Sequence, residues 1–289
     1  MSADDLRKRL EDLNGGPLNF EPNDPARLDD PDIALRRKLT RPKVRSADRF
    51  RAAVATTPKS EFIGENGSLT QLLPGKVRVN DAGIYYHVRR NPVDLAPWFE
   101  PVGQKIAEQA ADDRNYVFLD IETLGFQGEP VWLIGVLAAD EDGNWWCEQL
   151  LARDLKEEAA MILGLKSFAN AETSLVTFNG ISFDWPMIAD RGKRYEIEMP
   201  ELTRHHDMLL IARAAYGRRV PNHKLQTLES VVLGRERVDD VPGHRIPAVY
   251  REFVKTGMAG ELVEAVKHNV LDLVSTAELF TLTRRRGVR

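Results

Sequence analysis

The stretch Tyr116-Val-Phe-Leu-Asp-Ile-Glu122 decides the fold class, because it joins a strand pattern to a pair of acids. Its first four residues are apolar, and aromatic and β-branched types among them favour a buried strand. Asp120 and Glu122 stand two residues apart, so on a strand they point to the same face. Two neighbouring carboxylates at the end of a buried strand are costly unless a cation neutralises them. The simpler alternative is an exposed strand end with ordinary surface acids.

The segments around this stretch predict a mixed sheet with helices packed on it. Further strands are predicted over residues 131–139, 145–151, 174–178 and 204–208. The turn signal Glu141-Asp-Gly-Asn144 makes the second and third strands an antiparallel pair. Helices are predicted over 156–170, 183–191, from the fifth strand to 215, and over 225–233, 247–256 and 259–284. Three strands followed by alternating helices and strands are typical of the α/β class.

The chain divides into an N-terminal arm over residues 1–75, a lead-in segment over 76–112 and an organised domain over 113–289. The arm has few large apolar residues and many prolines, which predicts a largely irregular structure. Between Arg36 and Arg51 it carries eight basic residues and one acid. This stretch is either a solvated face or a tether to phosphate or to an acidic protein partner. The lead-in segment contains a turn and one short strand, Gly83–Val88.

Composition excludes several classes of protein. The formal charge of −4, from 40 basic and 44 acidic residues, argues against a wholly basic nucleic-acid coat protein, although a local basic groove remains compatible with it. The single cysteine, Cys147, excludes an intrachain disulfide and a cysteine-rich zinc site. No apolar run reaches the roughly 18 residues of a membrane span, and the first residues lack the pattern of a secretory signal. We therefore expect a cytoplasmic protein with no membrane partner.

Further along the chain, other acids could complete a metal site. Asp184 lies where the fourth strand passes into a helix, so it could cap that helix, bind a metal ion, or do both. His268 and Asp272 are four residues apart on the last helix and share a face, as a surface ion pair would. Carboxylate oxygens are the ligands that Mg²⁺ and Mn²⁺ prefer, and two such ions can serve phosphoryl transfer. A histidine beside them could act as a general base.

Three segments of the chain resemble the three exonuclease motifs of the DEDD-type 3′–5′ exonucleases, a group within the RNase H-like superfamily. These segments are Asp120-Ile-Glu122-Thr, Asn179 to Asp184, and His268 to Asp272. The sequence looks like the YprB-like branch of that group over about residues 113–283, including Asp240-Val-Pro-Gly-His-Arg-Ile-Pro247. The resemblance implies an RNase H-like fold, with a five-stranded mixed sheet flanked by helices. It also implies two Mg²⁺ or Mn²⁺ ions held by Asp120, Glu122, Asp184 and Asp272.

The third motif departs from the family pattern. DEDD enzymes usually carry His-x4-Asp or Tyr-x3-Asp there, whereas this chain has a histidine at the tyrosine-type spacing, His268-x3-Asp272. One residue on a helix is a rotation of about 100°. His268 therefore need not point as the usual histidine does, and the assignment of Asp272 as a ligand is firmer than that of His268 as the base.

The resemblance implies a metal-dependent nuclease, namely a 3′–5′ exonuclease that hydrolyses phosphodiester bonds of single-stranded DNA or RNA by a two-metal mechanism. Aromatic side chains near such a site can stack on bases, and polar or basic ones can contact phosphates. The candidate substrate contacts are Thr123, Leu124, Phe126, Asn179 and Lys224. Two alternatives stay open: an RNase H-like endonuclease on structured nucleic acid, and a nucleic-acid-binding module without catalysis.

Overall fold

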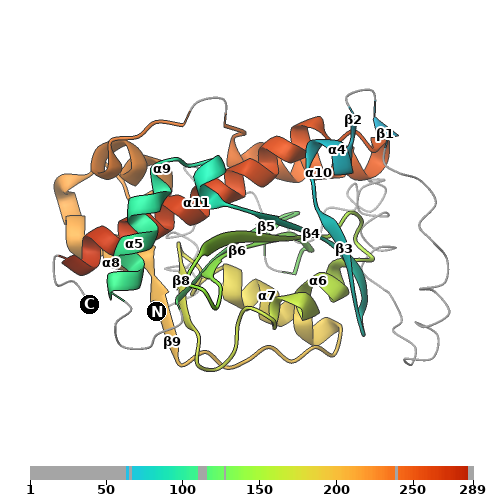
Figure 1. Ribbon diagram of the computed structural model, residues 1–289, viewed down its shortest axis with the longest axis horizontal. Helices are drawn as coiled ribbons and strands as arrows, with labels where there is room; N and C mark the ends of the chain where they lie inside the picture. Colours follow the sequence, from blue (N-terminus) through green and yellow to red (C-terminus); the bar gives the residue numbers. More distant parts are fainter. Residues whose placement is uncertain (1–62, 65–66, 110–115, 127, 238–239, 286–289) are drawn as a thin grey trace, which may run out of the picture. The chain divides into compact units, whose positions relative to one another are not determined.

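The computed structural model describes residues 63–64, 67–109, 116–126, 128–237 and 240–285 (Figure 1). Most of the predicted N-terminal arm, including the basic stretch between Arg36 and Arg51, lies outside the described residues. The end of the arm is described from Gly67 onward, and there Leu69 and Leu73 are buried in an apolar cluster with residues of the sheet.

Seven strands form one mixed sheet in the order β3-β4-β7-β6-β5-β8-β9. Their bounds are Lys76–Asn80 for β3, Gly83–Arg90 for β4, Tyr116–Thr123 for β5, Val131–Ala139 for β6, Trp145–Leu151 for β7, Ser174–Thr177 for β8 and Arg204–Asp207 for β9. Strand β5, in the interior of the sheet, is antiparallel to β6 and parallel to β8. β1 (Ile63–Gly64) and β2 (Gly67–Ser68) form a separate two-stranded pair.

The prediction of a five-stranded sheet is wrong by two strands. All five predicted strands are present as β5 to β9, but the lead-in segment adds the hairpin β3–β4 to the edge of β7. β4 runs antiparallel to β7 from Tyr86 opposite Leu151 to Arg90 opposite Cys147. The hairpin thus pairs the backbone groups of β7 that an edge position would leave open.

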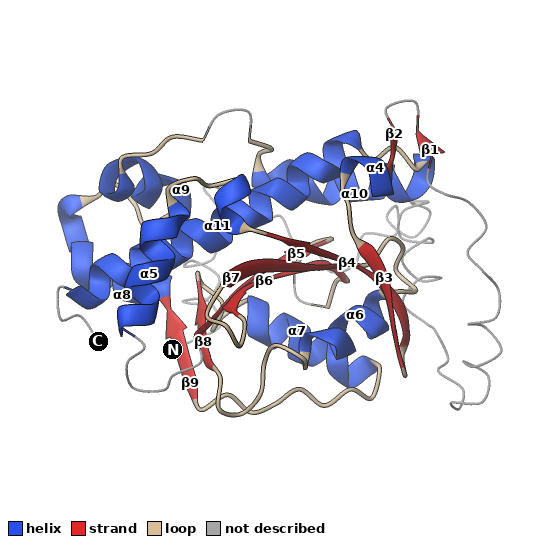
Figure 2. Ribbon diagram, viewed as in Figure 1, coloured by secondary structure: helices blue, strands red, loops and turns tan. Residues whose placement is uncertain are grey.

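Helices cover both faces of the sheet, as Figure 2 shows: α6 and α7 lie on one face, and α5, α8, α10 and α11 lie on the other. The helices are α4 (Leu69–Leu72), α5 (Phe99–Gln109), α6 (Glu158–Leu165), α7 (Asp184–Arg194), α8 (Met208–Tyr216), α9 (Leu225–Leu228), α10 (Ile246–Thr256) and α11 (Gly260–Arg285). Helix α5 was not predicted. The helix predicted over 225–233 divides into α9 and a π-helical turn, η4 (Glu229–Leu233), which Gly234 ends with a left-handed φ of 67°. None of the helices in the described part of the chain combines the length and the apolar character that a membrane span requires.

The alternation along β5 positions its acids. Tyr116 and Phe118 pack in one apolar cluster with residues of α11, whereas Val117 and Leu119 pack on the opposite face with α6 and α7. Since side chains of a strand alternate, Asp120 and Glu122 continue the α11 side. Trp132 of β6 is fully buried and stacks on Tyr250 at 4.6 Å between ring centroids, so it belongs to the core.

Candidate metal centre

Asp120 is tied to helix α11 by a buried asparagine, Asn269. Asn269 Nδ2 donates to Asp120 Oδ2 at 2.8 Å and to the Asp120 backbone oxygen at 3.2 Å. Asn269 Oδ1 in turn accepts from Gln149 Nε2 of β7 at 2.9 Å. One side chain of α11 therefore links two strands of the sheet and fixes the first candidate ligand.

The acids of β5 lie in an environment that disfavours negative charge. Burial, followed by the charges of Asp272, Asp184 and Glu122, raises the pKa of Asp120 well above its usual range, against the hydrogen bond from Asn269. Burial and the charges of Asp272 and Asp184 raise the pKa of Glu122 to about 8, although the nearby His268 acts in the opposite direction. The mutual effects show that the carboxylates of three separate elements act on one another at this end of β5.

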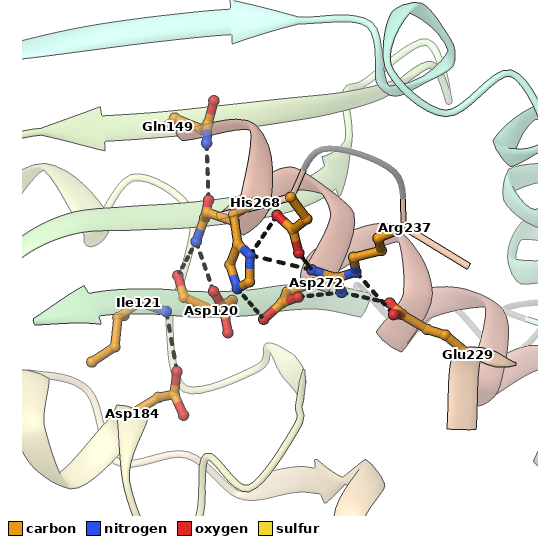
Figure 3. Close-up of polar contacts among 10 residues, drawn as sticks. Asp120, Ile121, Gln149, Asp184, Glu229, Arg237, His268 and Asp272 are labelled. Atoms are coloured by element: carbon orange, nitrogen blue, oxygen red, sulfur yellow. Dashed lines mark hydrogen bonds and ion pairs between the residues drawn. The ribbon is translucent and has the colours of Figure 1, made fainter. Parts of the chain in front are cut away.

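Asp184 is the first residue of α7 and is buried. Its Oδ1 accepts a hydrogen bond from the backbone N–H of Ile121 at 3.1 Å, which joins the start of α7 to β5 (Figure 3). The N-cap position belongs to Phe183, so the predicted capping role does not fall to Asp184. Burial raises the pKa of Asp184 to about 7, with contributions from the charges of Asp207 and Asp272.

His268 faces the other candidate residues despite the unusual motif spacing. Its Nε2 lies 3.6 Å from Asp272 Oδ2 on the next turn of α11. Its Nδ1 lies 2.7 Å from Asp240 Oδ1, so the imidazole is held between two carboxylates. Burial alone would lower the pKa of His268, but the hydrogen bond to Asp240 and the charges of Asp272 and Glu122 raise it.

Asp272 is paired with an arginine. Arg237 Nη2 donates to Asp272 Oδ1, and the same guanidinium contacts Glu229 and Asp240 (Figure 3). Burial alone would lower the pKa of Arg237, but the charge of Asp272 and the hydrogen bonds with Glu229 raise it. Asp272 is therefore the one candidate ligand that forms an ion pair with a lysine or arginine of the described residues.

The donor set suits a hard divalent cation. It consists of carboxylate oxygens, and burial together with the repulsion between neighbouring carboxylates raises the pKa values of Asp120, Glu122 and Asp184. As the side chains lie, no group of three or more Asp, Glu, His or Cys residues within the described ranges is arranged to hold a metal ion. The contacts explain this, since Asp184 is turned to the Ile121 backbone and Asp272 to Arg237.

The loop before Asp184 is shaped by an acid of the neighbouring strand. Asp207, at the end of β9, accepts from the backbone N–H of Asn179 at 2.9 Å, of Ile181 at 3.2 Å and of Leu209 at 2.9 Å. The last bond caps α8, and the first two fix the turn in which Asn179 has a φ of 68°. Asn179 is exposed beside this turn.

The remaining predicted substrate contacts differ in how accessible their side chains are. Thr123 is buried, and its hydroxyl donates to the backbone oxygen of Gly125 at 2.6 Å. Leu124 packs against an apolar cluster of the core. Phe126 is 73% exposed in the loop after β5, and Lys224 is exposed before α9. Of the two predicted apolar contacts in the loop after β5, Leu124 packs on the core and Phe126 is accessible to a ligand.

Some residues of this centre were not predicted. They are Asn269, Arg237, Glu229 and, as a partner of His268, Asp240. Asp240 stands within a segment that carries the family resemblance, but nothing in its local sequence shows which side chain it meets. The local sequence offers a cluster of basic and acidic residues over 235–240, but such a cluster is equally typical of a solvated loop.

Comparisons with known proteins agree with the resemblance. The uncharacterised protein YprB of Bacillus subtilis (strain 168) is 30% identical over 180 residues, which is 61% of this chain and 43% of the relative. The chain thus spans less than half the length of this relative.

Among solved structures, Escherichia coli exonuclease I in complex with a dT13 oligonucleotide matches with a TM-score of 0.38 and 14% identity, over 60% of this chain and 42% of that one. The EXO domain of Aedes aegypti Nibbler matches with a TM-score of 0.39 and 12% identity, over 66% of this chain and 86% of that one. A family model described as the RNase_H superfamily matches residues 117–284, the region that holds β5 to β9 and α11. The chain belongs to the RNase H superfamily.

Proposed function

We propose that this protein is a metal-dependent 3′–5′ exonuclease that hydrolyses single-stranded nucleic acid. The observation that carries the proposal is the convergence of Asp120, Glu122, Asp184 and Asp272 at one end of β5 in an RNase H fold. Asp120, Glu122 and Asp184 form no ion pair with a lysine or arginine of the described residues, and such a group of neighbouring carboxylates is unfavourable until cations arrive.

The four carboxylates would hold two Mg²⁺ or Mn²⁺ ions. When bound, such ions neutralise the charge that develops on the phosphate and help to generate the attacking hydroxide. Asn269 keeps Asp120 in place from α11, and the Ile121 N–H keeps Asp184 in place from β5. Both acids are thus oriented by hydrogen bonds before a substrate is present.

His268 is the proposed general base. When its Nδ1–H donates to Asp240 Oδ1, its Nε2 remains as the basic nitrogen on the side of Asp272. A water molecule near Nε2 would lose a proton to it as the phosphodiester bond breaks, and the product would be a nucleoside 5′-monophosphate. Asp240 thereby fixes the orientation of the imidazole.

Single-stranded substrate is proposed from the exposed side chains beside the centre. Phe126 in the loop after β5 could stack on a base, and Asn179 and Lys224 could contact the phosphate backbone. DNA and RNA are both compatible with these contacts.

Cleavage of end-labelled and circular oligonucleotides tests the proposal. On a linear single strand labelled at its 5′ end, we expect a ladder that shortens step by step. On the same strand labelled at its 3′ end, the first product should be the labelled mononucleotide. A circular single strand should stay intact, and its cleavage would replace the exonuclease by the endonuclease alternative. Binding of both strands by folded, metal-loaded protein without any cleavage would favour the non-catalytic module.

A further inference from the structure

The guanidinium of Arg237 is surrounded by three carboxylates (Figure 3). Its Nε donates to Glu229 Oε2 at 2.8 Å and its Nη1 donates to Asp240 Oδ2 at 3.1 Å. Its Nη2 donates to both Glu229 Oε1 and Asp272 Oδ1. The side chain of Arg237 is only 10% exposed, so these contacts are largely shielded from water.

These contacts are unequal. Glu229 receives two donors of the guanidinium, in the fork geometry in which arginine binds carboxylates most strongly. Asp272 receives one donor, and it shares that donor with Glu229. The Asp272 side chain is also 21% exposed, against 4% for Glu229. Arg237 would keep most of its partners if it released Asp272, whereas Asp272 would keep only His268 as a positive neighbour among the described residues.

Arg237 is the one lysine or arginine of the described segments that forms an ion pair with any of the four candidate ligands. A guanidinium and a divalent cation both neutralise a carboxylate, and two positive charges in one shielded site repel each other. Arg237 and a cation at Asp272 therefore compete for the same oxygen atoms.

We propose that Arg237 is a positioning residue that holds Asp272 in the metal-free protein, and that it releases Asp272 and keeps its bonds to Glu229 and Asp240 when a divalent cation binds Asp272. The proposal rests on the role of Asp272 as a metal ligand in the proposed function. Because the cation at Asp272 must displace a guanidinium, it binds more weakly than the cation at Asp120. The two positions are then filled in order.

Mn²⁺ binding to the full chain, measured by isothermal titration calorimetry at fixed pH and ionic strength, tests this order. Arg237→Gln removes the competitor, so the weaker Mn²⁺ step should become about tenfold tighter, or about 1.4 kcal/mol. Glu229→Gln removes the carboxylate that receives Arg237, so the same step should become about tenfold weaker. The stronger step should change by less than about twofold in both variants.

Arg235→Gln is the matched control. It removes the same charge two residues away, from an arginine that pairs with Glu278 and not with a candidate ligand, and both Mn²⁺ steps should stay near those of the wild type. Equal changes of both steps in Arg237→Gln would indicate a general effect of charge and would overturn the proposal. Shifts in the same direction for Arg237→Gln and Glu229→Gln would also overturn it.

If circular dichroism shows that Arg237→Gln is unfolded, the Glu229→Gln variant tests the proposal alone. In that variant, the proposal is overturned if the affinity of the weaker Mn²⁺ step is unchanged or higher than in the wild type. A structure of the wild type with Mn²⁺ gives a readout that is independent of affinity. It should show Arg237 bonded to Glu229 and separated from Asp272, and an intact pair with Asp272 would contradict the proposal. Mn²⁺ binding that Asp120→Asn leaves unaltered would instead overturn the metal centre, and this proposal with it.

Discussion

Asn269 of α11 lies over Gly135 of β6, so close that a Cβ on Gly135 would stand 2.0 Å from Asn269 Oδ1. Gly135 is paired with Asp120 on one side and with Gln149 on the other. Asn269 bonds these same two residues across the glycine. The missing side chain at Gly135 thus allows α11 to approach the sheet and to hold the strand that carries Asp120.

Substitution of Gly135 by alanine should disturb this contact. The added methyl group overlaps Asn269, so we expect a loss of about 1–3 kcal/mol in the free energy of unfolding. Mn²⁺ affinity should fall as well, because Asn269 would be pushed away from Asp120. Urea unfolding and calorimetry measure the two effects. Gly243→Ala is the control, since a Cβ there meets nothing within 4 Å. Equal behaviour of the two variants would contradict the role of the Gly135 contact.

The stability of the metal-free protein should depend on pH. In the folded protein burial raises the pKa of Glu122 to about 8 and that of Asp184 to about 7, above their usual values of 4.5 and 3.8. A raised folded-state pKa contributes stability that is complete below the unfolded pKa and is lost as pH rises through the folded pKa. In EDTA, Tm should therefore fall between about pH 4 and pH 8.

Mg²⁺ should reverse that trend, because it binds the ionised carboxylates and its effect grows as the protons leave. Differential scanning calorimetry at several pH values, in EDTA and in Mg²⁺, measures both curves. The Glu122→Gln/Asp184→Asn variant should show a flatter curve in EDTA. A wild-type Tm that rises with pH in EDTA would show that these acids are not the destabilising groups.

His268→Gln should separate catalysis from metal binding. Loss of a general base lowers kcat by about 10²–10⁴-fold. Mn²⁺ affinity should change little, because the four carboxylates remain in place. Steady-state cleavage of a labelled single strand gives kcat, and His244→Gln is the control since His244 is exposed. A His268→Gln variant with the kcat of the wild type would exclude His268 as the base.

Phe126→Ala should weaken substrate binding. Stacking of a base on an aromatic ring is worth about 1–3 kcal/mol, which corresponds to a loss of about 5-fold to 150-fold in affinity. Fluorescence anisotropy of a labelled single strand, measured in the Asp120→Asn background to prevent cleavage, gives the Kd. Val254→Ala is the control, because Val254 is an exposed apolar residue on α10. Equal affinities for the two variants would show that Phe126 makes no contact with the bases.

The sequence predicts where the strands of this fold lie along the chain better than it predicts which strands pair with one another. The five strands from β5 to β9 follow from local patterns of apolar residues and turns. The hairpin β3–β4 joins the sheet through a pairing with β7, more than 50 residues away along the chain, and no local pattern shows such a partner. Helix α5 was missed although Phe99, Val102 and Ile106 are buried on one of its faces. Its proline, Pro101, falls in the first turn, where it is tolerated.

The same limit applies to the site. Asp120 and Glu122 can be singled out from the sequence because charged side chains at the end of a buried apolar strand are unfavourable unless something neutralises them. Arg237 stands among other charged residues, as a surface residue would, and its local sequence does not show that it meets Glu229, Asp240 and Asp272. Asn269 gives no signal until Gly135 is placed beneath it. The sequence therefore singles out acids whose position is unusual in itself, but it does not show residues whose role depends on which neighbours the fold brings to them.

Degradation of a 5′-labelled single strand, as DNA and as RNA, in Mg²⁺, in Mn²⁺ and in EDTA is the most direct test of the central claim. The wild type should degrade at least one of the two strands in Mg²⁺ or Mn²⁺ and neither in EDTA. Asp120→Asn and Asp272→Asn, each verified as folded, should lose at least about 10²–10³-fold in rate. Degradation in EDTA, or an Asp120→Asn variant as active as the wild type, would contradict a metal-dependent nuclease built on these carboxylates.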